Sequence, residues 1–251
     1  MPDGGAGTRE RDGRFRVLES ERPFTGRVVT VRVDEVTMPG GGVARREVVE
    51  HARAVAVAAV DSECRVVLIE QYRHPLRRRL WELPAGLMDV AGESPAACAA
   101  RELAEETGLA ADRWSVLVDL ATSPGFCTEA VRVFLARDLR AVAAPDAQDE
   151  EADLRVVRVP LADAVAAVLD GRIVNAAAVA GVLAAARVLG VDPGTVPGGD
   201  GDGEALLRPA DDGWDGGPAT VNVGARADTA PPLGAASNAR INFSPRGSSS
   251  R

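Results

Sequence analysis

The sequence contains no lysine, so all 29 of its basic residues are arginine. Only two histidines, one tyrosine and three cysteines occur among its 251 residues. The cysteines, at positions 64, 98 and 127, are odd in number, scattered and without CxxC spacing. A disulfide framework of the kind found in small secreted proteins is therefore not indicated, and neither is a cysteine-based zinc site.

Long apolar runs are also missing. No stretch approaches the roughly 18 apolar residues of a membrane span, and the opening segment MPDGGAGTRERDGRF has no hydrophobic region of a signal peptide. The net charge of −8 and the pI near 5.0 argue against a general binder of nucleic acid or of membrane surfaces. We therefore expect a cytoplasmic protein that binds neither.

The N-terminal part shows an alternating pattern. Residues 1–13 are polar and glycine-rich, and we expect them to be disordered. The stretch GRVVTVRVDEVTMPGGGVARREVVEH (26–51) alternates with period two on both sides of MPGGG, which predicts a hairpin of two strands. Residues 14–53 are accordingly expected to form an N-terminal β subdomain.

The central part alternates between apolar strands and alanine-rich helices. RLWELPAG (79–86) leads into a helix near 92–108, and Asn175 is the expected N-cap of the last helix. Two further helices are predicted at 161–170 and 175–189. Strands are predicted at 54–60, 65–72, 115–122, 130–137 and 154–161.

The last quarter of the chain differs in composition. Of the 60 residues from Asp192 onward, 11 are glycine and 7 are proline, with no sustained periodicity. This composition is typical of a low-complexity tail, which we place at 191–251.

The segment GESPAACAARELAEETG (92–108) gathers three acids, Glu102, Glu105 and Glu106, within five residues. Like charges one turn apart destabilise an isolated helix, so something must offset their repulsion. Glu102 and Glu106 share a helix face, and hard divalent cations such as Mg²⁺ bind carboxylate oxygens. A solvent-exposed acidic face is the alternative interpretation.

The surrounding residues favour the metal site. GLMDVAGESPAACAARELAEETGL (86–109) resembles the Nudix box, G-x5-E-x7-R-E-U-x-E-E-x-G-U, where U is a bulky aliphatic residue. Six residues instead of five separate the first glycine from the first glutamate, an extension that precedes the acidic helix face. Every fixed position is present: Gly86, Glu93, Arg101, Glu102, Leu103, Glu105, Glu106, Gly108 and Leu109.

This resemblance implies an α/β (α+β) fold, a Nudix-type α/β/α sandwich with a mixed sheet at 54–190, preceded by the N-terminal β-hairpin subdomain. It implies hydrolysis of a nucleoside diphosphate linked to another group, with Mg²⁺ or Mn²⁺ as cofactor. The implied metal ligands are Glu102 and Glu106, with Glu105 as a further ligand and the carbonyl of Ala85 completing the set. Arg101 and Glu93 are implied to pair and to orient the ligand glutamates.

Over about residues 20–190 the chain is most similar to the bacterial, actinobacterial-type ADP-ribose pyrophosphatases of that family. The stretches that carry the similarity include QYRHPLRRRLWELPAGL (71–87) and SPGFCTE (123–129). The resemblance implies cleavage of ADP-ribose to AMP and ribose 5-phosphate. The alternatives are another nucleotide sugar, NADH or a dinucleoside polyphosphate as substrate, or a non-catalytic ADP-ribose sensor.

Further site residues follow from the same resemblance. Glu151, or else Glu150, is the expected general base in the acidic loop DEEAD (149–153). Arg73 is expected to contact the diphosphate. The subgroup also implies a homodimer with swapped N-terminal strands. Phe24, in this N-terminal part, is a candidate contact to the substrate. The remaining expected substrate contacts are Trp81, Pro124, Gly125, Phe126 and Glu129.

Overall fold

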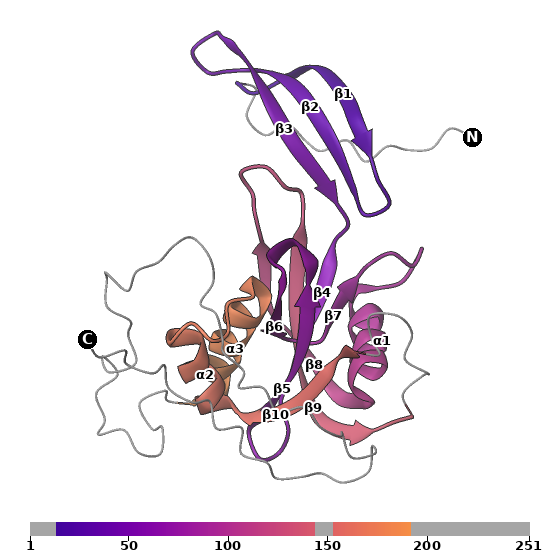
Figure 1. Cartoon of the computed structure of the whole chain (residues 1–251), viewed down its shortest axis with the longest axis vertical. Coiled ribbons are helices and arrows are strands. Elements are labelled where there is room, and N and C mark those ends of the chain that lie inside the picture. Colours follow the sequence, from indigo (N-terminus) through magenta and orange to yellow (C-terminus); the bar gives the residue numbers. More distant parts are fainter. Residues whose placement is uncertain (1–13, 144–152, 192–251) are drawn as a thin grey trace.

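The structure, a computed structural model, describes residues 14–143 and 153–191. Its first part is a three-stranded antiparallel sheet in the order β1-β2-β3 that lies at one end of the molecule, beyond the helices and sheets of the body (Figure 1). The strands are β1 (Val17–Thr25), β2 (Val29–Thr37) and β3 (Val43–His51). The expected disordered segment 1–13 lies outside the described residues, as does the expected tail apart from Val191.

The predicted hairpin at 26–51 is incomplete as an account of this sheet. β2 and β3 do form a hairpin in regular register, from Val29 opposite His51 to Thr37 opposite Val43. The structure adds β1, which pairs with β2 but shifts register twice along its length. Such bulges break the period-two pattern by which a strand is recognised in sequence.

The body contains two further sheets. The larger has the order β7-β4-β9-β8 and is mixed, since β4 runs parallel to β9 while the other neighbours are antiparallel. The smaller, β10-β5-β6, is antiparallel. A single 3₁₀ turn, His74–Leu76, follows β5. The strands are β4 (Ala54–Ala59), β5 (Arg65–Arg73), β6 (Arg78–Glu82), β7 (Ala85–Leu87), β8 (Leu109–Ala121), β9 (Ala130–Ala141) and β10 (Arg155–Pro160).

Helices cover both faces of the larger sheet. They are α1 (Pro95–Thr107), α2 (Leu161–Leu169) and α3 (Ala176–Leu189). Figure 1 shows α1 on one side of the strands and α2 with α3 on the other. Alternate residues of β4 serve the two sides: Val55 and Val57 pack in the cluster that contains α1, and Ala56 and Ala58 in the cluster that contains α3. The predicted α/β/α sandwich with a mixed sheet is confirmed.

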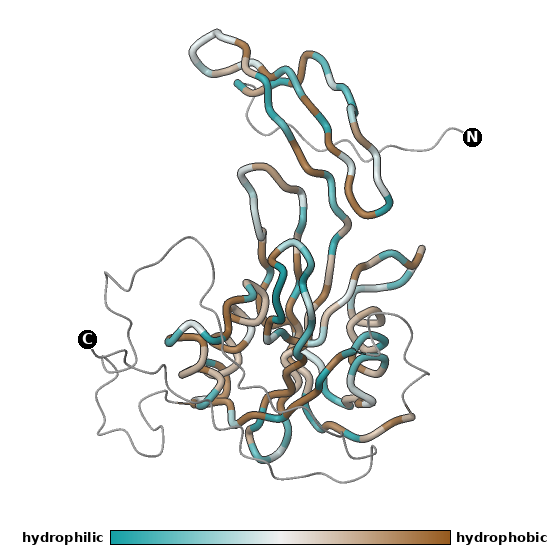
Figure 2. Tube along the Cα trace, in the orientation of Figure 1, coloured by the Kyte–Doolittle hydropathy of each residue, from teal (hydrophilic) through white to brown (hydrophobic). Residues whose placement is uncertain are grey.

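The hydropathy of the chain follows this division. Figure 2 shows apolar and polar residues alternating along the N-terminal sheet, while apolar residues concentrate in the strands and helices of the body. The whole of β1 is exposed to solvent, whereas β4 is buried beyond its first residue. Since a small sheet with solvent on both sides has no core of its own, other contacts must stabilise it.

The ends of the helices are set by local side chains. Ser94 caps α1 by accepting a hydrogen bond from the amide of Ala97 at 3.2 Å. Gly108 ends the same helix in the left-handed conformation, at φ 64°, which glycine adopts without strain. Asn175 caps α3 through the amide of Ala178 at 3.0 Å, also as predicted.

All three cysteines are free. Cys98 lies on the buried face of α1, and this burial raises the pKa of its thiol to about 12. A thiol with such a pKa is not reactive at neutral pH. None of the helices in the described ranges has the length and apolar character needed to cross a membrane.

Candidate active site

Arg101 is the centre of the acidic cluster on α1. Its guanidinium donates to both carboxylate oxygens of Glu93, at 3.0 and 3.1 Å. It also donates to Glu102 at 2.7 Å and to Glu105 at 2.9 Å. The hydrogen bonds from Arg101 to Glu93 lower the pKa of Glu93. The repulsion among the acids is therefore offset partly within the protein, by an arginine that holds three carboxylates in fixed positions.

Glu106 lies apart from this arginine. The structure gives it one hydrogen bond, from the backbone amide of Ala85 at 2.9 Å. The pKa of Glu106 is raised to about 8, chiefly by desolvation; the Ala85 amide and Arg73 lower this pKa, and the charges of Glu102 and Glu82 raise it. Burial also raises the pKa of Glu102. Two half-buried carboxylates thus lie close together, and the surrounding positive charge does not fully offset the cost of their desolvation.

Gly86 is required by the close approach of Glu102. A Cβ atom at this position would lie 2.0 Å from Cδ of Glu102 and 2.1 Å from its Oε1. Any side chain here would push the glutamate away, which explains why the first position of the motif is glycine. The one-residue extension of the following loop leaves this contact in place.

The residues fit a divalent cation by their chemistry. Within the described ranges, no three His, Cys, Asp or Glu side chains form a ready-made metal-binding group. Glu102 and Glu105 are instead held by Arg101. The raised pKa values of Glu102 and Glu106 nonetheless show that their ionised forms need positive charge, and carboxylate oxygens are the donors that Mg²⁺ and Mn²⁺ prefer.

Arg73 is held by a residue that the sequence did not single out. Its Nε and Nη2 donate to the two carboxylate oxygens of Glu82, at 2.8 and 2.7 Å, and the Glu82 side chain is only 3% exposed. Both residues act electrostatically on Glu106, so the pair lies near the acidic cluster. The available signal was an acid within the apolar run LWEL, because a buried carboxylate needs a partner.

Arg73 also lines a hollow of about 270 Å³ at the end of β5, together with Tyr72, His74 and Asp153. Asp153, the last residue of the acidic loop DEEAD and the one with which the described residues resume, forms an ion pair with Arg79 of β6. The predicted general bases Glu150 and Glu151 lie outside the described residues. Their role remains a prediction.

The predicted substrate loop lies elsewhere on the molecule. Pro124, Gly125, Phe126 and Glu129 belong to the connection between β8 and β9, where the Phe126 side chain is 58% exposed. Glu129 accepts a hydrogen bond from the hydroxyl of Thr122 at 2.6 Å. Figure 1 shows this loop beside the N-terminal sheet and away from α1. One chain therefore does not bring the loop together with the glutamates of α1.

The two aromatic candidates lie in different environments. Trp81 is 6% exposed and packs in the core, with the guanidinium of Arg155 5.5 Å from its ring centroid. Phe24 is 54% exposed on β1. Core packing accounts for Trp81 without a substrate, whereas Phe24 is available for a partner; substrate contacts by either residue remain predictions.

Comparison with known proteins agrees with this geometry. A model of the NUDIX domain matches residues 50–180, a range that contains β4, α1 and the complete acidic cluster. Taken with the sandwich fold and the glutamate-bearing helix, this match shows that the chain belongs to the Nudix family.

Two proteins are similar to the chain in sequence, and one solved structure is similar to it in fold. The chain is 50% identical over 200 residues to an ADP-ribose pyrophosphatase of Mycobacterium tuberculosis, which covers 80% of this chain and 91% of that protein. It is 36% identical over 167 residues to a methanol dehydrogenase activator of Bacillus methanolicus, covering 66% and 90%. A crystal structure of an ADP compounds hydrolase superposes with a TM-score of 0.63 at 23% identity, covering 71% and 97%, which supports the fold.

Proposed function

We propose that this protein hydrolyses the diphosphate bond of ADP-ribose, giving AMP and ribose 5-phosphate. The observation that carries the proposal is the pair of half-buried glutamates on α1, Glu102 packed against Gly86 and Glu106 bonded to the amide of Ala85, where both carboxyl groups have a raised pKa. The similarity to an ADP-ribose pyrophosphatase, at 50% identity over 91% of that protein, supports the choice of substrate.

Glu102, Glu106 and the carbonyl of Ala85 would hold the divalent cation, with Glu105 as a further ligand. The bound cation, Mg²⁺ or Mn²⁺, supplies positive charge to the diphosphate and lowers the pKa of the attacking water. The chain itself orients the ligands. Arg101 fixes Glu102 and Glu105 while it is held by Glu93, and Gly86 leaves room for the Glu102 carboxylate.

The remaining roles belong to residues outside the acidic cluster of α1. Arg73, whose side chain is 40% exposed and is oriented by its two hydrogen bonds to Glu82, contacts the diphosphate. Glu151, or else Glu150, accepts the proton of the attacking water. Pro124, Gly125, Phe126 and Glu129 contact the substrate.

We propose that the active form is a homodimer in which the N-terminal strands, within the subdomain 14–53, are exchanged between subunits. The exposure of β1 and of Phe24, at 54%, supports a partner at this sheet. The separation of the β8–β9 loop from α1 within one chain supports it too, since a second subunit is needed to bring such a loop to the glutamates. Three free cysteines accord with the reducing cytoplasm as its location.

A comparison of substrates tests the proposal. Purified protein is given ADP-ribose, a second nucleotide sugar or NADH at equal concentration, and the released nucleotide is measured. The highest kcat/KM is expected for ADP-ribose. A higher kcat/KM for another compound would support the hydrolase activity but would show that ADP-ribose is not the preferred substrate. Binding of ADP-ribose without cleavage of any compound would identify a sensor and overturn the proposal.

A further inference from the structure

The loop between β8 and β9 is hydrogen-bonded to the edge of β3 that faces away from β2. The amide of Val49 donates to the carbonyl of Phe126 at 2.7 Å, and the amide of Thr128 donates to the carbonyl of Val49 at 2.9 Å. Val49 and Cys127 form a parallel bridge. The loop thus adds a short extended segment to the N-terminal sheet, although it connects two strands of the body.

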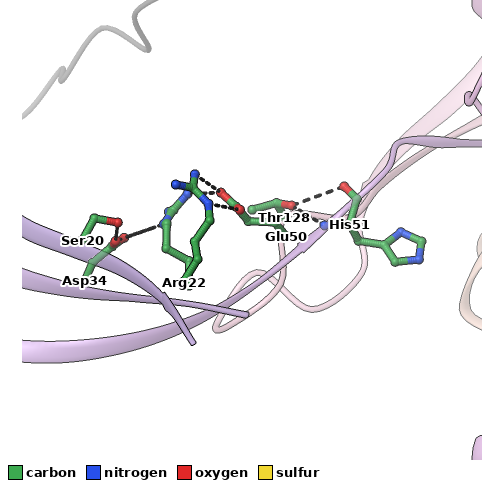
Figure 3. A network of polar contacts seen from close by, with 7 residues as sticks. Ser20, Arg22, Asp34, Glu50, His51 and Thr128 are labelled. Carbon is green, nitrogen blue, oxygen red and sulfur yellow. Dashed lines mark hydrogen bonds and ion pairs between the residues drawn. The ribbon is translucent and has the colours of Figure 1, made fainter. Parts of the chain in front are cut away.

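Thr128 closes this junction with its side chain. Its hydroxyl oxygen accepts a hydrogen bond from the amide of His51 at 3.0 Å, and the same hydroxyl donates to the carbonyl of His51 at 3.4 Å (Figure 3). The next residue, Glu129, has a carboxylate oxygen 3.5 Å from Nδ1 of His51. The last residue of β3 is therefore held on both its backbone polar groups by one hydroxyl.

The same end of β3 is also fixed to the other two strands. Glu50 accepts hydrogen bonds from Arg22 of β1, at 3.1 and 3.4 Å, and from Arg32 of β2. Arg32 in turn donates to Asp34 at 3.0 Å, and Asp34 accepts from Ser20 at 2.7 Å (Figure 3). Glu50 and His51 thus connect a network across the whole sheet to the loop of the body.

We propose that Thr128 is a positioning residue that makes the loop 122–129 part of the N-terminal sheet. The sheet then determines where the loop carries Phe126, whose side chain is 58% exposed. A sheet that docks on a second subunit takes the loop with it and presents it to the substrate there. The inference rests on the proposed function and on the proposed dimer.

Kinetics of two substitutions at one position test the role. Thr128→Val removes the hydroxyl and keeps the β-branched shape, whereas Thr128→Ser keeps the hydroxyl. T128V is expected to raise KM for ADP-ribose about fivefold, the effect of losing the two hydrogen bonds between the hydroxyl and His51, with kcat within about twofold of wild type. T128S is expected to retain the wild-type KM. An unchanged KM in T128V, or an equal rise in both variants, would overturn the proposal.

Hydrogen exchange tests the junction without any substrate. In T128V, amides of 47–51 and 122–129 are expected to exchange faster while those of α1 keep their protection; T128S should match wild type. Unchanged exchange in T128V would refute the junction. Loss of protection in α1 as well would mean that T128V disturbs the whole body, and Thr128→Ala is then measured instead. Faster exchange at 47–51 and 122–129 alone would support the junction, and unchanged exchange there would refute it. A wild-type protein that does not cleave ADP-ribose would overturn the proposed function, and exchange would still decide the role of Thr128.

Discussion

Glu106 combines burial with a single backbone donor, the amide of Ala85 at 2.9 Å. Because burial raises its pKa to about 8, the folded protein without metal holds a proton on this carboxyl group at pH values where the unfolded chain, with a pKa of 4.5, has lost it. The folded state therefore binds more protons between these two values, and its stability falls as the pH rises through them.

The expected fall in stability with rising pH can be tested. Without metal, the free energy of unfolding is expected to fall from pH 5 to pH 8 by on the order of a few kcal/mol through Glu106 alone. In Glu106→Gln this part of the slope should disappear, and saturating Mg²⁺ should reverse it in the wild type, since the cation binds the ionised form. Urea unfolding with EDTA at four pH values measures it; equal slopes in wild type and E106Q would contradict the assignment.

Gly86 makes a second prediction at the residue scale. Gly86→Ala places a methyl group 2.0 Å from Cδ of Glu102, so the carboxylate must move. We expect activity to fall at least about 10-fold, since displacing a group that orients a metal site costs this much. Gly42→Ala is the matched control, because no atom lies within 4 Å of its added methyl group. A fully active G86A would show that Glu102 tolerates displacement.

The sequence predicted only part of the site at this scale. The structure shows Arg101 bound to Glu93, as the resemblance to the Nudix box implies, because both lie in one contiguous motif. The bond from Arg73 to Glu82 was not predicted. It depends on the antiparallel pairing of β5 with β6, which no local pattern specifies.

At the scale of elements, α1 depends on the cap at its first turn. Ser94→Ala removes the acceptor for the amide of Ala97 and is expected to lower the free energy of unfolding by about 1 kcal/mol. Ser94→Asp retains an acceptor and should remain near wild type. Chemical denaturation measures both. A loss in S94D equal to that in S94A would show that the cap does not stabilise the helix.

Regular elements were predicted better than irregular ones. The strand predicted at 54–60 and the helices at 161–170 and 175–189 agree with β4, α2 and α3 within one residue at each end. β1 was missed because two register shifts and Pro23 disrupt its alternation. β6 and β7 are adjacent in sequence, and their residues were predicted only as the segment that precedes α1. They lie in two different sheets, which is a tertiary feature that local sequence does not specify.

At the scale of the whole molecule, the exposed N-terminal sheet predicts a dimer. The wild type is expected at a mass of about 52 kDa, twice the 26.1 kDa of one chain. Phe24→Asp places a charge on the 54%-exposed Phe24 position and should give a monomer, whereas Val188→Asp, at a 64%-exposed position of α3, should not. Light scattering after size-exclusion chromatography decides. A monomeric wild type would contradict the dimer.

The layered arrangement of the body was predicted from the resemblance of residues 86–109 to the Nudix box, which implied an α/β/α sandwich. How the N-terminal sheet and the β8–β9 loop join was not predicted, because Val49 and Phe126 lie far apart in the chain and their contact is a backbone hydrogen bond. Backbone pairing of this kind leaves no signature in side-chain chemistry.

Release of AMP from ADP-ribose, in wild type and in Glu106→Gln, tests the central claim most directly. Each protein is assayed with Mg²⁺, with Mn²⁺ and with EDTA, and Glu63→Gln, an acid with a 69%-exposed side chain, is the matched control. We predict cleavage that requires a divalent cation, that falls at least about 100-fold in E106Q and that is retained in E63Q. Cleavage in EDTA, or full activity in E106Q, would contradict a cation site on the glutamates of α1.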